Sequence, residues 1–115
     1  MKKISLAFVI LNFLTALFIL VLDSKPILAQ PSFDCAKAST AMELVICGDE
    51  TISEMDAYMA QLYTSLRHAP GVDKNALLKS QRNFVRQRDQ ACARSGDALN
   101  CLFDWYQNRI NELLA

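Results

Sequence analysis

Four cysteines, Cys35, Cys47, Cys92 and Cys101, carry the most evident chemistry in this chain of 115 residues. An even number of thiols in a small exported chain pairs as disulfides or, less often, binds a metal ion. The spacings of 12, 45 and 9 residues contain no C-x-x-C motif, and the single histidine, His68, is far from every cysteine in sequence. We therefore predict no metal site and no cofactor. We expect the pairs Cys35–Cys47 and Cys92–Cys101, because each closes a short local segment and stabilises the fold by about 3 kcal/mol.

Arg88 is the most informative charged residue. At 100° per residue it falls, with Gln81, near the middle of the apolar side of a helix that also carries Leu77, Leu78, Phe84, Val85, Ala91 and Cys92. A buried guanidinium requires a carboxylate, a carbonyl or an aromatic ring nearby. We predict that Arg88 is tethered to Asp56 of a neighbouring helix. The alternative is a cation that inserts into a partner's acidic cleft.

Arg109 falls on the apolar face of the following helix, which gathers Leu99, Leu102, Trp105, Tyr106, Ile110 and Leu113. Trp105, four residues earlier, and Glu112, three residues later, are the partners that helical spacing offers. The amide of Gln81 can join either arginine, since it both donates and accepts.

Two exposed groups are candidates for binding a partner. Arg67 and His68 precede Pro70-Gly71 and are expected at a loop tip between helices. Asp49 and Glu50 belong to an acidic group that can steer a cationic protein or, more simply, complement the start of a helix.

Catalysis is not predicted. No serine, cysteine or threonine has a histidine partner at a supporting spacing, and three glycines in the whole chain leave no phosphate-binding loop.

Residues 1–29 have the composition of an export signal. Lys2 and Lys3 precede a nearly unbroken apolar run from Ile4 to Leu22, and Ala29 is a small residue at a cleavage point. We expect cleavage there, which leaves residues 30–115 as one periplasmic or secreted domain. An uncleaved membrane anchor is the alternative, because the run is long enough to span a bilayer. Residues 32–34, before the first cysteine, do not form the small apolar run of a lipoprotein signal.

The charge of the mature chain excludes some partners. Removal of the signal lowers the basic residues from 12 to 9 and the acidic residues from 12 to 11, which leaves about −2. This balance argues against nucleic acid, and a membrane is a partner only if the signal segment is retained.

The elements that must position these residues are helices. Thr40 with Glu43 and Thr51 with Glu54 have the capping-box spacing, and Asp73 and Asp97 are expected caps. No run alternates with period two. We predict an all-α, disulfide-bonded bundle with one short helix and three longer ones.

Four motifs together resemble the lysozyme inhibitor LprI-like N-terminal domain family. They are D-C-A-K-A-x-T-x-x-E-x-x-I-C from Asp34, the Met55-Asp56 pair, Q-R-x-F-x-x-x-R-x-x-x-C from Gln81 and C-L-x-x-x-Y-x-x-R-I from Cys101. Met55 replaces an expected leucine and Phe84 an expected tryptophan. The resemblance implies a small exported helical domain that binds a protein, with lysozyme as the partner that gives the family its name. The alternative function is an envelope scaffold or interaction module without inhibitory activity, with or without an anchor formed by an uncleaved N-terminal helix.

Overall fold

The structure, a computed structural model, describes residues 29–115 and confirms the predicted all-α class. A 3-10 turn, η1 (Cys35–Lys37), is followed by α2 (Ala41–Gly48), α3 (Glu50–His68), α4 (Lys74–Ala93) and α5 (Ala98–Leu114), and the described residues contain no strand. One short helix and three longer ones were expected. The proposed export signal lies almost entirely outside the described residues. Among those residues, no helix combines the length and apolar character that crossing a bilayer requires.

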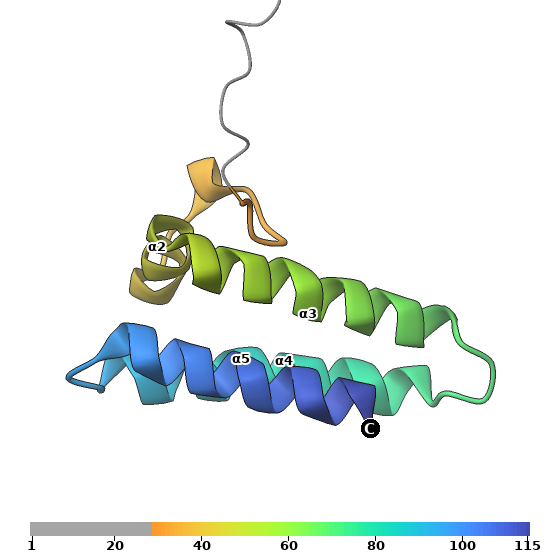
Figure 1. The fold of residues 1–115 in the computed structure, drawn as a ribbon. Helices are drawn as coiled ribbons and strands as arrows, with labels where there is room; N and C mark the ends of the chain where they lie inside the picture. Colours follow the sequence, from red (N-terminus) through yellow and green to blue (C-terminus); the bar gives the residue numbers. More distant parts are fainter. Residues whose placement is uncertain (1–28) are drawn as a thin grey trace, which may run out of the picture.

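The three long helices form one bundle, with the α4–α5 hairpin on one side and α3 laid along it (Figure 1). The short helix α2 packs across one end of the bundle, where it contacts α3 and both helices of the α4–α5 hairpin. The most extensive contact between long helices is that of α3 with α5. This arrangement brings side chains from three different helices into one narrow core.

Local sequence chemistry explains most helix starts. Thr40 Oγ1 accepts the Glu43 N–H at 3.1 Å while Glu43 Oε2 accepts the Thr40 N–H at 3.1 Å, which is the predicted capping box. Asp73 and Asp97 cap α4 and α5 through their carboxylates, as predicted. Each cap satisfies amide groups that have no partner within the helix.

The start of α3 differs from the prediction. The helix begins at Glu50 rather than after Thr51, and Asp49 alone separates it from α2. The Asp49 carboxylate accepts the Ile52 N–H at 2.9 Å, and Ser53 Oγ donates to the Ile46 carbonyl of α2 at 2.6 Å. The two helices are therefore joined through one extended residue, and the Thr51–Glu54 box is not used as a cap.

The buried core is narrower than the predicted apolar faces. It consists of Met42, Ile46, Ile52, Met59, Phe84, Cys92, Leu102, Tyr106 and Leu113. Val85 is 38% exposed and Leu99 is 44% exposed, although both were placed on buried faces. In α4 the buried positions are Phe84, Arg88 and Cys92, each one turn from the next, so Val85 is rotated about 100° from that row. In a bundle of so few helices, the neighbouring helices cover only this narrow side of each helix surface.

Candidate functional site

A chain of buried polar groups joins the three long helices. The Arg88 guanidinium of α4 donates to the Tyr106 hydroxyl of α5 at 2.6 Å. That hydroxyl donates to Asp56 Oδ1 of α3 at 2.7 Å. Asp56 Oδ2 accepts the Ser32 N–H at 2.6 Å, so the carboxylate also fixes the segment that precedes η1. We call Arg88, Tyr106 and Asp56 the central triad.

The structure shows how the expected contact between Arg88 and Asp56 is made. Arg88 Nη1 lies 4.0 Å from Asp56 Oδ1, with the Tyr106 hydroxyl bonded to both, while Asp89 is the nearer carboxylate at 2.7 Å. Arg88 and Asp56 are 4% and 2% exposed, and Tyr106 is fully buried. Burial raises the pKa of the Tyr106 hydroxyl far above its ordinary value, so the group remains protonated and can donate to the carboxylate. The sequence placed Tyr106 on the buried face but gave no sign of this bridging role.

Arg109 has a second set of partners, mostly on α4. Its Nε donates to Gln81 Oε1 at 3.0 Å, and its Nη1 donates to Ser80 Oγ and to Glu112 Oε2, both at 2.9 Å. The aromatic ring near its guanidinium is that of Phe84, 5.8 Å from the ring centroid, instead of the expected Trp105. The Gln81 amide group contacts Met59 Sδ at 2.9 Å. Gln81 thus joins the Arg109 set and links it to α3.

Arg67 and His68 occupy the last turn of α3 and not a loop. His68 Nδ1 lies 2.8 Å from the Thr64 carbonyl oxygen, and the Arg67 guanidinium lies 5.8 Å from the Tyr63 ring centroid. Both side chains are exposed. Both side chains therefore contact the preceding turn of α3. The helix includes the two residues that were expected to begin the loop.

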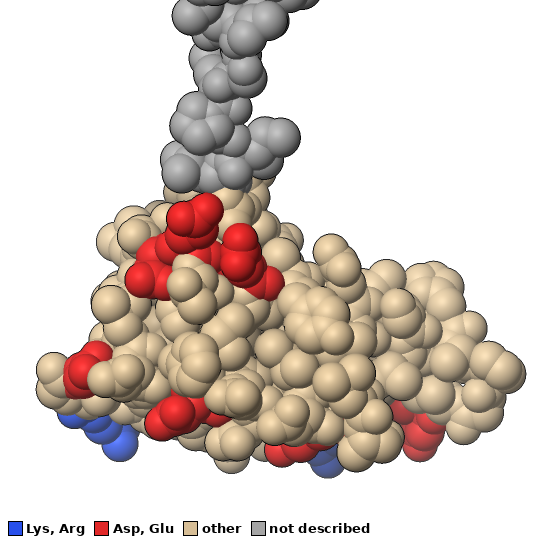
Figure 2. All heavy atoms as spheres, in the orientation of Figure 1, with Lys and Arg blue, Asp and Glu red and all other residues tan. Residues whose placement is uncertain are grey.

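The acidic group that includes Asp49 and Glu50 lies at the other end of α3, where the helix begins. On the face drawn in Figure 2, acidic atoms gather over η1, α2 and the first turns of α3, and few basic atoms are visible. Glu50 is exposed, whereas Asp49 is half-buried and caps α3. Asp49 also lines a small depression of about 170 Å³ with Leu99 and Phe103, which are 44% and 39% exposed. Exposed apolar side chains thus lie beside the acidic group. The helical pattern did not predict this, because it placed Leu99 on a buried face.

Two disulfides hold the ends of these elements together. Cys35–Cys47 joins η1 to α2, and Cys92–Cys101 joins α4 to α5 across the hairpin turn, with Cα–Cα distances of 5.9 and 5.5 Å. These are the predicted pairs. Within residues 29–115, no group of three or more histidine, cysteine, aspartate or glutamate side chains is arranged to hold a metal ion.

Comparison with known proteins places this architecture in a family. The sequence model described as "Lysozyme inhibitor LprI" matches residues 34–113, a span that contains both disulfides and the central triad. The chain belongs to the LprI family. Proteins named "Lipoprotein LprI" from Mycobacterium bovis and Mycobacterium tuberculosis are each 30% identical to it over 86 residues, which is 74% of this chain.

The chain spans only 42% of the length of these LprI relatives. No solved structure matches the chain. The relatives are named as lipoproteins, whereas in this LprI domain the first cysteine of the described residues, Cys35, is bonded to Cys47.

Proposed function

We propose that this chain is an exported inhibitor of lysozyme that acts by binding and not by catalysis. The observation that carries the proposal is the family match, which extends over nearly the whole described domain, from residue 34 to residue 113. The match is to the scaffold as a unit, since it extends from η1 to the last turn of α5 and includes all four cysteines. The name of the family then supplies the partner.

The scaffold has the properties that a protein inhibitor needs. Two disulfides and a triad that joins three helices hold the surface in one conformation, which lowers the entropy lost on binding. Disulfides persist in oxidising compartments such as the periplasm or the extracellular medium. These are the compartments in which an exported protein would encounter a lysozyme. We propose export by cleavage after Ala29, and the N-terminal residue of the exported protein tests this.

Two groups of charged residues, one at each end of α3, are proposed to contact the enzyme. Asp49 and Glu50 would steer a cationic lysozyme, and Arg67 and His68 would offer a cation or a donor to acidic groups on its surface. The two groups occupy opposite ends of α3, about 27 Å apart by the helical rise. They can therefore be tested separately.

Turnover of bacterial cell walls by a chicken-type lysozyme, with increasing amounts of the purified full chain, tests the proposal. We expect a saturable loss of turnover, and we expect reduced and alkylated protein to lose this effect. Unchanged turnover at a large molar excess of oxidised protein would refute inhibition. Retention of the chain by cell envelopes without inhibition would favour the scaffold function instead.

Matched variants separate the two surfaces. Asp49→Asn removes a charge but keeps a good helix cap, and Asp73→Asn makes the same change at the start of α4. If the acidic group steers the enzyme, only Asp49→Asn slows association at low salt, and the difference disappears as salt is added. Inhibition that survives Arg67→Ala combined with His68→Ala would exclude the end of α3 as the contact.

A further inference from the structure

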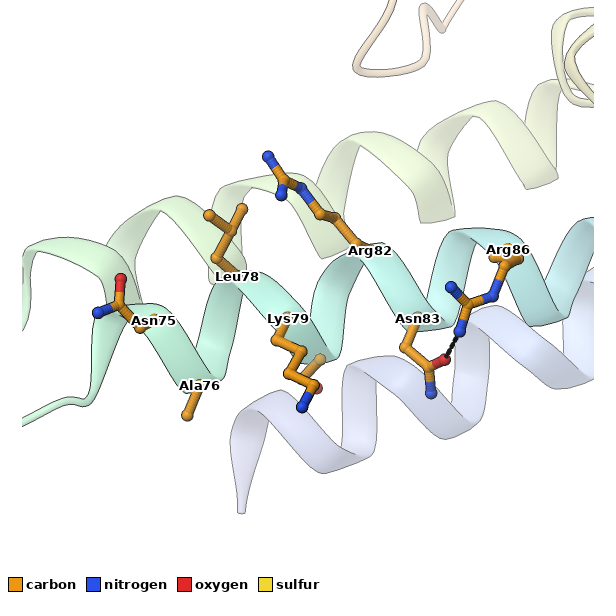
Figure 3. A pocket seen from close by; sticks show the side chains of 8 residues that line it. Asn75, Ala76, Leu78, Lys79, Arg82, Asn83 and Arg86 are labelled. Carbon is orange, nitrogen blue, oxygen red and sulfur yellow. Dashed lines mark hydrogen bonds between the residues drawn. The ribbon is translucent and has the colours of Figure 1, made fainter.

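The first two-thirds of α4 carries an exposed basic face that none of the structural networks uses. Lys79, Arg82 and Arg86 are exposed and spaced by three and four residues, so they share one side of the helix. With Asn75 and Leu78 they line an open groove of about 690 Å³. Figure 3 shows Arg82 extending away from α4 beside Leu78, and Arg86 reaching to the amide of Asn83.

The charges of this face are not compensated within the described residues. Arg88 and Arg109, the buried arginines, have carboxylates within 4.0 Å, whereas no carboxylate of residues 29–115 forms an ion pair with Lys79, Arg82 or Arg86. The sequence from Lys74 to Arg88 contains five basic residues and no acidic one. The positive potential of the face is therefore directed outward.

The stability of the helix does not account for this arrangement. A solvated helix face gains stability when opposite charges stand three or four residues apart, and it loses stability when like charges do. Arg82 has Lys79 three residues before it and Arg86 four residues after it, so both charged neighbours at these spacings repel it. Leu78, half-buried, and Val85, 38% exposed, add apolar surface beside the cations. Arginine with adjoining apolar area is the composition of a protein-binding surface.

We infer that this face of α4 is the surface that enters the active-site cleft of lysozyme, with Arg82 and Arg86 paired to its acidic residues. The inference rests on the proposed function and names the contact. A lysozyme cleft is concave and holds two catalytic carboxylates, while a helix is a convex rod about 10 Å across with protruding side chains. Shape and charge are thus complementary. Arginine also binds carboxylates in a bidentate manner that lysine or histidine cannot match.

Other exposed cations fit the cleft less well. The end of α3 offers one arginine, Arg67, whose guanidinium lies near the Tyr63 ring, and one histidine, His68, bonded to the Thr64 carbonyl, whereas α4 presents two arginines on one face. Lys37 and Arg94 lie on η1 and at the end of α4, distant in the sequence from the basic face. They are useful as controls because both are exposed.

The test compares two double charge reversals of the full chain. The variant Arg82→Glu with Arg86→Glu alters the basic face, and Lys37→Glu with Arg94→Glu changes the net charge by the same amount elsewhere. Circular dichroism and thermal melting of both variants establish that the fold is retained. Because added negative charge favours encounter with a cationic lysozyme, loss of inhibition in the first variant alone cannot be an effect of net charge.

We expect the first variant to raise the inhibition constant about tenfold or more and the control to leave it unchanged or lower it. We also expect wild-type inhibition to be competitive with a chitin oligosaccharide that occupies the cleft. Equal inhibition by the folded Arg82→Glu, Arg86→Glu variant and the wild type would overturn the inference but leave the proposed function intact. Absence of inhibition by the wild type would refute both. If the reversal abolished binding to anionic phospholipid vesicles but not inhibition, the face would be assigned to a membrane and the inference would be wrong.

Discussion

Replacing Tyr106 with phenylalanine removes a single buried oxygen from the centre of the bundle. The hydroxyl lies 2.6 Å from Arg88 Nη1 and 2.7 Å from Asp56 Oδ1, and both partners are charged. The phenylalanine ring would retain the edge-on contact with Phe84, whose centroid is 5.7 Å away, and the position 5.4 Å beneath the Arg88 guanidinium. The substitution therefore isolates the hydrogen bonds from the packing of the ring.

The expected loss follows from the two bonds. A hydrogen bond to a charged group contributes about 1.5–3 kcal/mol to stability. Arg88 keeps Asp89 and Asp56 keeps the Ser32 N–H, so neither charge is left without a partner. We therefore expect a loss of about 2–4 kcal/mol, near the lower end of two full bonds. For a domain of this size each kcal/mol lowers the melting temperature by about 4–8 °C.

Urea unfolding followed by circular dichroism measures this free energy, with the slope as a check that unfolding remains two-state. The matched control is Tyr58→Phe, the same change at a side chain that is 46% exposed, where we expect a difference within about 0.5 kcal/mol. If Tyr106→Phe were as stable as the control, Arg88 and Asp56 would be satisfied without the bridge. The reasoning about the triad would then be wrong.

Three further predictions concern the same scaffold. Arg88→Met should destabilise the domain by about 3–5 kcal/mol, because it leaves the buried Asp56 without its cation; unchanged melting with lost lysozyme binding would make Arg88 a contact residue instead. Replacing Cys92 and Cys101 together with serine should cost about 3 kcal/mol, measured by unfolding under oxidising conditions, and identical stability would refute the chain-entropy argument. Hydrogen bonds from the Ser39 and Thr40 N–H groups lower the pKa of Glu43, so its contribution to stability should be complete well above pH 4.5 and disappear as the pH falls through the lower folded-state value. Unfolding of Glu43→Gln and wild type between pH 7 and about pH 3 checks this, since a difference that does not shrink in acid would contradict it.

Several features of the fold could be predicted because their physical cause is local. The cap at Asp73 depends on amide groups two and three residues away, and the Thr40–Glu43 box on a span of four residues. The two disulfides are likewise local, since each joins residues that a short segment must bring together. The apolar row of α5 followed from helical period alone, with Leu102 and Leu113 buried as expected.

The start of α3 shows where local reasoning failed. Asp49 and Thr51 are both good caps, and each is followed at a suitable distance by a residue that fits a first turn. The choice involves the end of α2, because with α3 beginning at Glu50 the Ser53 hydroxyl donates to the Ile46 carbonyl of α2. The same limit applies to Arg109, whose aromatic neighbour is Phe84 of α4 and not Trp105 of its own helix.

The sequence by itself determined that this is a helical, disulfide-bonded domain and that Arg88 and Arg109 must find partners, because periodicity, caps and the cost of a buried charge act within a few residues. Only the tertiary structure decided which atoms provide those partners. Tyr106 stands 18 residues from Arg88 and 50 from Asp56, and the three meet only when α3 packs on the α4–α5 hairpin. The same packing turns the basic side of α4 outward, since the opposite side is occupied by Phe84, Arg88 and Cys92.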